Sequence, residues 1–204
     1  MIVLMRHAQT EGGAGRCIGR TPVPLSDAGR ERARHIVASL RSVGFKRLCA
    51  SPAQRAQDTL DPLARVLDMT VETLPALNEI DMGKWDGLPF EDVRRLYADG
   101  YAERGGHFGS FRPPLGESFM DVADRALVAL NELAHGALPV LVATHAGVLR
   151  SVLCRVTGHP MDDLFHFKPD YAHCVLLRSG TNGLELIASD VSPDDLPTFF
   201  DSNS

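Results

Sequence analysis

The sequence predicts an α/β fold, in which a mainly parallel central sheet carries helices on both faces as a three-layer sandwich. Three short apolar runs, Ile2–Met5, Arg47–Ala50 and Pro139–Ala143, have the length and composition of strands buried on both faces of a sheet. Stretches with apolar residues at helical spacing lie between and after these runs, as expected for a parallel sheet. A chain of 204 residues is long enough for a well-buried core, and we expect a single domain over residues 1–204.

Composition and charge narrow the function classes. The net charge of −5 argues against a nucleic-acid partner, because such proteins usually present a basic face. No segment approaches the roughly 18 apolar residues of a membrane span. Met1–Met5 is too short for a signal peptide and lacks a basic start, so we expect a cytoplasmic protein without a membrane partner. Among the scattered cysteines, Cys49 and Cys154 fall inside apolar elements and are expected to be reduced core thiols.

Each of the three predicted strands is followed closely by a cationic or titratable side chain. Arg6 and His7 follow the first strand, Arg55 lies five residues after the second, and His145 lies two residues after the third. In open α/β sheets, ligands bind outside the carboxyl ends of the strands. If the strands are parallel neighbours, two guanidinium groups and two imidazoles meet in one small volume. Arginine matches the planar, multi-oxygen geometry of phosphate, so the pattern predicts an anion site.

Helix-start signals place the segments that follow the first two strands. Ser26 is a predicted N-cap for a helix that runs to about Val43. After the second strand, Ser51 is expected to cap a helix with Pro52 at its first position and Gln54 completing a capping box. This arrangement places Arg55 on the first turn, where the helix N-terminus adds attraction for an anion.

The second half of the chain shows further predicted elements. Its helices are expected from Gly87 to about Arg104, from a Ser118–Asp121 capping box to about Ala134, and from Val148 to about Thr157. Its strands are expected at Thr70–Leu77 and on both sides of an Asn182-Gly183 hairpin turn, at His173–Arg178 and Leu184–Ala188. The polar tail at 192–204 is expected to be frayed.

Five sequence blocks, in order along the chain, resemble the signature of a known family. They are Arg6–Thr10 (RHAQT), Ser51–Thr59 (SPAQRAQDT), Glu79–Gly87 (EIDMGKWDG), Gly116–Ser118 (GES) and Thr144–Arg150 (THAGVLR). The family is the histidine phosphatase superfamily, which includes the cofactor-dependent phosphoglycerate mutases. The resemblance spans residue 2 to about residue 178 and implies a phosphoglycerate mutase-like fold. A single R-H-x-x-T is weak evidence, whereas five ordered blocks are specific.

The resemblance implies hydrolysis of a phosphomonoester through a phosphohistidine on His7. Arg6, Arg55 and His145 are expected to hold the phosphate oxygens, and a nearby phosphate favours a protonated His145. Further substrate contacts are expected from residues beside these: Gln9, Arg20 and Ala146. Arg20 has an equally good interpretation as a loop arginine paired with a surface carboxylate. No metal or other cofactor is expected, because arginine and histidine supply the positive charge.

Two carboxylates compete for the role of general acid. Glu79 is favoured over Asp81 by its spacing to Gly83 and Trp85. A free glutamate has a pKa of about 4.3, so the role requires surroundings that keep Glu79 protonated. Trp85, the one tryptophan in the chain, is expected to shield this loop from water or to pack in the core, and the two roles are compatible.

The segment Gly15–Leu25 (GRCIGRTPVPL) resembles the α-ribazole phosphatase branch of the family, which acts in cobalamin nucleotide-loop assembly. A small phosphorylated metabolite is therefore the expected partner, with α-ribazole 5'-phosphate the first candidate. The sequence departs from the family at Gly13, where an asparagine is usual. Residues 87–115 are expected to form a variable cap over the pocket and to select the substrate.

Several alternatives remain open from the sequence. Within the family, they are a broad-specificity sugar or nucleotide phosphatase and a mutase, although mutases tend to carry larger insertions. Outside this chemistry, they are a non-catalytic phosphate-binding module and a metal-dependent hydrolase that uses His7 and His145. The sequence contains no H-E-x-x-H motif, which disfavours the last. A homodimer is also open.

Overall fold

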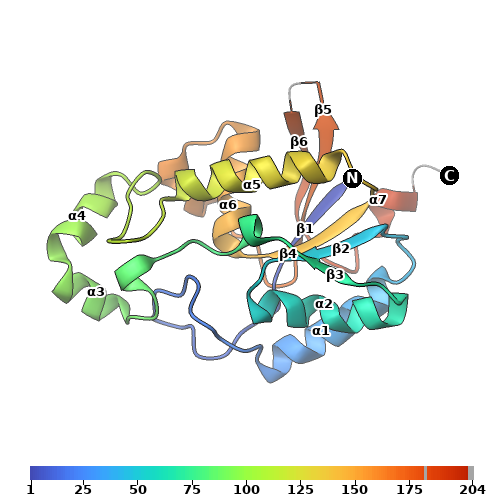
Figure 1. Ribbon diagram of the computed structural model, residues 1–204, viewed down its shortest axis with the longest axis horizontal. Helices are drawn as coiled ribbons and strands as arrows, with labels where there is room; N and C mark the ends of the chain where they lie inside the picture. Colours follow the sequence, from blue (N-terminus) through green and yellow to red (C-terminus); the bar gives the residue numbers. More distant parts are fainter. Residues whose placement is uncertain (182, 202–204) are drawn as a thin grey trace.

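The computed structural model describes residues 1–181 and 183–201, and a single mixed sheet runs through the middle of this part of the chain (Figure 1). Its strands are β1 (Ile2–Arg6), β2 (Arg47–Ala50), β3 (Val71–Thr73), β4 (Val140–Thr144), β5 (Cys174–Gly180) and β6 (Gly183–Val191). They lie in the order β3-β2-β4-β1-β5-β6. The first four in this order are parallel, and β5 and β6 are antiparallel additions at one edge.

Helices cover both faces of the sheet, which confirms the predicted three-layer sandwich. Figure 1 shows α1 (Asp27–Leu40) and α2 (Gln54–Leu67) below the sheet, and α5 (Phe119–Ala134) and α6 (Ala146–Thr157) on the other side. The alternation of side chains along a strand, with a core on each face of the sheet, explains why β1 is apolar from Ile2 to Met5. Ile2 and Leu4 pack in the core under α5 and α6, whereas Val3 and Met5 pack in the core over α1 and α2.

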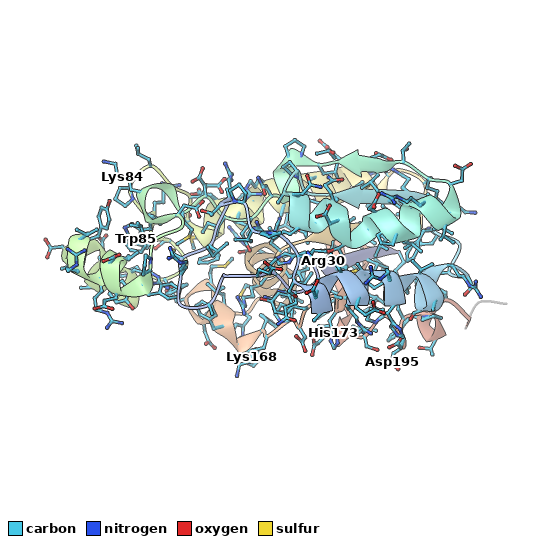
Figure 2. The ribbon with its side chains drawn as sticks, turned by 90° about the horizontal axis from the view of Figure 1, so that it is seen from below. Arg30, Lys84, Trp85, Lys168, His173 and Asp195 are labelled. Carbon is cyan, nitrogen blue, oxygen red and sulfur yellow. The ribbon has the colours of Figure 1, made fainter. Side chains whose placement is uncertain are left out.

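A separate lobe stands at one end of the molecule and contains α3 (Phe90–Leu96) and α4 (Ala98–Gly106) (Figure 1). The sequence predicts one helix here, but Tyr97 has φ −130° and ψ 45°, which interrupts the helix between the two segments. Trp85 lies at this end of the molecule (Figure 2), is fully buried, and packs against Tyr97 and Phe111 with ring centroids 6.1 and 5.2 Å away. The tryptophan therefore forms a small core for the lobe.

Short 3-10 helices replace some of the expected regular structure. They are η1 (Pro75–Leu77), η2 (Gly83–Trp85) and η3 (Met161–His166). The strand expected over Thr70–Leu77 is limited to β3, and the chain turns into η1 at Pro75. Proline has no N–H for the sheet and fixes φ near the helical value, so it ends the strand.

Two of the three predicted helix caps are confirmed. The Ser26 hydroxyl accepts a hydrogen bond from the Gly29 N–H, and Ser118 and Asp121 form the reciprocal capping box. The predicted cap at Ser51 is wrong, because α2 begins three residues later and its N-cap is Ala53. The Ser51 hydroxyl accepts the Ala53 N–H at 3.2 Å and lies 2.6 Å from Nε2 of His145, so it joins the loop before α2 to a distant residue instead of capping the helix.

The predicted C-terminal hairpin is confirmed as the antiparallel pair β5–β6, although Asn182 of its turn lies outside the described residues. The expected frayed tail is wrong up to the end of the described chain. Leu196 is fully buried, and Phe200 in α7 (Thr198–Asp201) packs against Phe45. Burial of these side chains offsets the chain entropy that frays most termini.

Two other expectations can be compared with the structure. All of the cysteines are free and buried, as expected for reduced core thiols. Within the described part of the chain, no helix has both the length and the apolar character needed to cross a bilayer.

Candidate active site

The three strands that carry the predicted site residues are immediate neighbours. β4 lies between β1 and β2, all three are parallel, and Arg6 pairs in register with Thr144. Their carboxyl ends therefore reach the same edge of the sheet. His7 follows β1 and His145 follows β4, and their ring centroids lie 5.2 Å apart in an edge-to-face arrangement. The topology thus brings together the two imidazoles that the sequence placed 138 residues apart (145 − 7).

A cavity of about 480 Å³ opens at this edge of the sheet. Its walls include five residues that are expected to bind or attack the phosphate: Arg6, His7, Gln9, Arg55 and Ala146. Glu79 also lines it, whereas His145 lies against His7 with its side chain fully buried. Another hollow, along α2 and β3, is lined by Asp58, Asp61 and Asp68, whose charge disfavours a phosphate.

The rest of the cavity wall is apolar with three further cations. The apolar side chains come from the Gly15–Leu25 segment, the residue before η2, the lobe with the loop that follows it, α5 and η3: Ile18, Val23, Met82, Phe90, Phe108, Phe119 and Phe165. The cations are Arg16, Arg104 and Arg150. Gly13 is also part of the wall, and a Cβ there would have its nearest neighbour, Ile18, 3.8 Å away. The usual family asparagine is therefore absent from a position with room for a side chain.

His7 has one ring nitrogen committed to the backbone. Its Nδ1–H donates to the carbonyl oxygen of Ala8 at 2.8 Å, and the Ala8 N–H in turn donates to Thr59 at 2.9 Å. A carbonyl oxygen can only accept, so Nδ1 carries the proton and Nε2 keeps its lone pair. Burial, reinforced by the charges of Arg55 and Arg6, lowers the pKa of His7 to about 3. The imidazole is therefore neutral at neutral pH.

Backbone carbonyl groups hold the two guanidinium groups. Arg55 is 2% exposed and donates to Gly19 O at 2.7 Å and to Thr21 O at 3.2 Å. Arg6 donates to Pro169 O at 3.0 Å and lies 3.6 Å from the centre of the Tyr171 ring. Carbonyl groups and an aromatic face orient these cations without neutralising them. Burial lowers the pKa of both arginines, but a guanidinium keeps its charge in proteins.

The surroundings of His145 favour its neutral form. Burial, together with the positive charges of Arg55 and the neighbouring residues, lowers its pKa well below the ordinary value. Its Nε2 contacts the Ser51 hydroxyl, and its buried Nδ1 has no hydrogen-bond partner among the described residues. The protonated form of His145 that is expected beside a phosphate therefore requires the charge of a bound anion.

Glu79 is a buried carboxyl group on the cavity wall. Its two oxygens accept hydrogen bonds from the Ile80 N–H at 2.9 Å and from the Gly147 N–H at 3.2 Å. Burial raises the pKa of Glu79, and these two hydrogen bonds and the charge of Arg55 oppose that rise only in part. The surroundings of Glu79 therefore favour its protonated form, which is the form that a general acid needs.

Arg20 is not among the residues that line the cavity, which disfavours its expected role in binding substrate. It forms ion pairs with Asp81 at 2.9 Å and with Glu117 at 3.1 Å, which is the alternative left open by the sequence. Asp81 also accepts a hydrogen bond from the Gly83 N–H at 2.8 Å. Because Asp81 is occupied by Arg20 and the loop backbone while Glu79 faces the cavity, the geometry favours Glu79 as the acid.

Sequence reasoning missed three residues that support the site. Tyr171 stacks on Arg6 and lies just before β5. The pairing of β5 with β1 brings Tyr171 to the same edge of the sheet as His7, and a predicted hairpin alone does not reveal which strand β5 pairs with. Asp86 accepts hydrogen bonds from the backbone N–H groups of Gly19, Arg20 and Thr21, which shapes the loop whose carbonyls hold Arg55. Arg125 donates to the Glu79 carbonyl oxygen at 3.2 Å. Its position in the middle of α5 carries no motif.

Gly147 is packed directly against the Glu79 carboxyl group, and we expect Gly147→Ala to lower activity. A Cβ at this position would lie 2.3 Å from Oε1 of Glu79, so the carboxyl must move. A displacement of about 1 Å in a catalytic group can cost on the order of 100-fold in rate. The measurement is kcat/KM for a phosphomonoester, with unfolding monitored in parallel. Wild-type activity would contradict the placement of Glu79, and Gly158→Ala at the other end of α6 is the control for a merely structural loss.

Comparison with known proteins agrees with this geometry. The family model of the histidine phosphatase superfamily (branch 1) matches residues 2–190. An adenosylcobalamin/alpha-ribazole phosphatase from Escherichia coli K12 is 29% identical over 171 residues, covering 82% of this chain and 84% of that protein. A glucosyl-3-phosphoglycerate phosphatase from Mycolicibacterium vanbaalenii is 31% identical over 172 residues, covering 79% and 76%. The crystal structure of the alpha-ribazole phosphatase from Shigella flexneri superposes with a TM-score of 0.82 at 26% identity, covering 93% and 95%.

The chain belongs to the histidine phosphatase superfamily, branch 1. It is a phosphatase with a phosphoglycerate mutase-like fold, and its cavity at the carboxyl ends of β1, β2 and β4 carries the family's signature residues.

Proposed function

We propose that this protein hydrolyses a phosphomonoester in two steps through a phosphohistidine on His7. The observation that carries the proposal is the hydrogen bond from Nδ1 of His7 to the Ala8 carbonyl oxygen, which leaves Nε2 as an unprotonated nucleophile. In the first step, Nε2 attacks phosphorus, the N–P bond forms, and the bond from phosphorus to the ester oxygen breaks. In the second step, water attacks the phosphohistidine, and inorganic phosphate and free His7 result.

Four groups stabilise the transferred phosphoryl group in this proposal. Arg6 and Arg55 donate to its oxygens, and each charge-assisted hydrogen bond contributes about 1.5–3 kcal/mol. His145 donates through Nδ1, because Ser51 accepts the Ala53 N–H at 3.2 Å and can give its own proton to Nε2. A dianion beside His145 also raises the pKa that burial has lowered. Ala146 adds a free backbone N–H at the start of α6.

Glu79 serves both steps. In the first, its carboxyl proton passes to the leaving alkoxide, and in the second, the resulting carboxylate takes a proton from the attacking water. Gln9 lines the same wall and contacts the substrate beside the phosphate. Arg6 and Arg55 supply the positive charge that a metal-dependent hydrolase takes from its ion, and we propose that the reaction proceeds without a metal.

We propose α-ribazole 5'-phosphate as the substrate and the segment 87–115 as part of the cap that selects it. The cavity that is lined by Arg6, His7 and Arg55 also has aromatic side chains on its wall, including Phe90 and Phe108. A flat benzimidazole base suits such walls, because aromatic rings pack well against one another. Relatives that are named alpha-ribazole phosphatases support this choice.

A phosphorylated carboxylic acid is a second candidate substrate. Arg16, Arg104 and Arg150 also line the cavity, and they suit a second anionic group. The relative named as a glucosyl-3-phosphoglycerate phosphatase is consistent with this alternative.

Two matched pairs of substrates separate these candidates. We expect kcat/KM for α-ribazole 5'-phosphate to exceed that for ribose 5-phosphate by about tenfold or more, because burial of the base contributes about 1.5–3 kcal/mol. Ribose 5-phosphate keeps the phosphate and sugar and lacks only the base. Equal values for this pair would contradict the aromatic proposal. A larger preference for 3-phosphoglycerate over glycerol 3-phosphate would favour the second candidate.

A further inference from the structure

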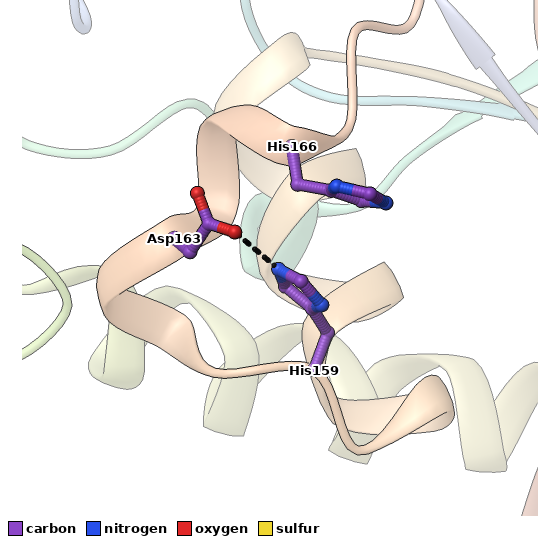
Figure 3. Close-up of side chains that lie close together, drawn as sticks. All are labelled: His159, Asp163 and His166. Atoms are coloured by element: carbon purple, nitrogen blue, oxygen red, sulfur yellow. Dashed lines mark hydrogen bonds and ion pairs between the residues drawn. The ribbon is translucent and has the colours of Figure 1, made fainter.

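Two histidines and an aspartate gather on one face of the segment that follows α6, outside the cavity that holds His7. His159 lies just before η3, whereas Asp163 and His166 belong to it, and the turn of the chain at Asp163 brings the three side chains together. Figure 3 shows Asp163 directed at His159, with the ring of His166 above that of His159. The Nε2 of His159 lies 2.9 Å from Asp163, and the two imidazole centroids lie 4.5 Å apart. One potential ligand atom from each residue lies within 4.8 Å of the others.

We propose that His159, Asp163 and His166 bind a divalent transition-metal ion, with Zn²⁺ as the best match. Two imidazoles and one carboxylate are donors that Zn²⁺ prefers, and three protein ligands leave a fourth position for water. Zinc–ligand bonds of about 2.0–2.2 Å require the three atoms to close in by about 1–1.5 Å. Asp163 and His166 are exposed, and His159 is only partly buried, so their side chains can make that adjustment.

Other histidine–aspartate pairs of this protein show what distinguishes the cluster. His35 contacts Asp194 at 3.0 Å and His173 contacts Asp190 at 2.9 Å, at nearly the same distance as in the His159 pair. Among the described residues, only the cluster of His159, Asp163 and His166 places at least three histidine, cysteine, aspartate or glutamate ligand atoms this close together. The second imidazole gives this cluster a third donor, which neither of the two ion pairs has.

Phe165 connects the proposed metal site to the cavity, because it lies between Asp163 and His166 in the sequence and lines the cavity. It packs edge-to-face against Phe108 at 5.0 Å and lies 4.9 Å from the guanidinium of Arg150. A metal that joins residues 159, 163 and 166 ties both ends of this stretch together. We therefore infer that metal binding restrains the wall of the cavity contributed by η3.

The test is calorimetric titration of Zn²⁺ into the full-length protein after removal of metals with a chelator. We expect one ion to bind per chain, with affinity lowered by about tenfold or more in His159→Asn and in His166→Asn, and lost in the double variant. His35→Asn is the matched control and should bind like the wild type. Hydrogen exchange of residues 159–166 should slow on addition of Zn²⁺ in the wild type but not in the double variant.

The proposal is overturned if Zn²⁺ does not bind the wild type, or if it binds the double variant with wild-type affinity. It is also overturned if binding is lost in His7→Asn and kept in the double variant, because the ion would then lie in the phosphatase site. Unfolding temperatures measured without metal show whether each variant is folded. The proposal is independent of the phosphohistidine mechanism, since the titration contains no substrate.

Discussion

Replacement of His7 by alanine should lower kcat by about four orders of magnitude or more, because it removes the nucleophile of both steps. The remaining groups, Arg6, Arg55 and Glu79, can still bind a phosphomonoester, but they offer no nitrogen at phosphorus. The same variant should form no phosphoenzyme. Brief incubation with a ³²P-labelled phosphomonoester, followed by quenching in alkali, should label the wild type, and the label should be lost in acid because an N–P bond is acid-labile.

The control for this experiment is His135→Ala. His135 is an exposed histidine at the end of α5, and its ring contacts the Asn131 carbonyl oxygen rather than the cavity. It should keep wild-type turnover and labelling. Residual activity near the wild-type level in His7→Ala, or a label that survives in that variant, would refute the phosphohistidine scheme. Because His7 is 7% exposed, circular dichroism and the unfolding temperature should be measured for both variants.

Elements governed by local physical rules were predictable from the sequence. The buried strands β1, β2 and β4 carry unbroken apolar runs, and Ser26 and Ser118 cap their helices through hydrogen bonds three residues away. The convergence of His7, Arg55 and His145 followed from strand ends and from the family blocks. Parallel neighbours place such ends at one edge, so the site depends on topology more than on side-chain detail.

Features determined by long-range partners were not predictable. Ser51 has the sequence context of a cap, but its hydroxyl contacts His145, which is 94 positions away in the chain. Arg20 has the context of a substrate ligand, yet Asp81 and Glu117 occupy its guanidinium. In both cases a tertiary contact, which local sequence does not encode, determines what the side chain does. The tail behaves similarly, since Leu196 is buried by residues far from it in sequence.

The acid role of Glu79 leads to a second large effect. We expect Glu79→Gln to lower kcat/KM for an alkyl phosphate by about 10²–10⁴, the usual contribution of general acid–base catalysis. With p-nitrophenyl phosphate, the first step should be affected much less, because nitrophenolate leaves without a proton. The second step still needs the base, so the variant should release a burst of nitrophenol of about one equivalent per chain and then turn over slowly.

Asp81→Asn is the matched control, since it makes the same change in the rival carboxylate on the same loop. Asp81 pairs with Arg20 outside the cavity, so its loss should change the rate little compared with the loss of Glu79. A decrease as large as that in Glu79→Gln, or a Glu79→Gln variant with wild-type kcat/KM on the alkyl phosphate, would show that the acid has been assigned to the wrong residue.

The pH dependence of kcat/KM tests the same assignment, because this quantity reports the free enzyme. His7 must be neutral to attack, and its pKa, lowered to about 3 by burial, keeps it neutral at every pH above that value. Glu79 must be protonated to donate, and burial raises its pKa, so the active form extends to higher pH than for an ordinary glutamate. Activity on an alkyl phosphate should therefore fall as pH rises through the raised pKa of Glu79. In Glu79→Gln that decline should disappear, because no carboxyl remains to lose its proton.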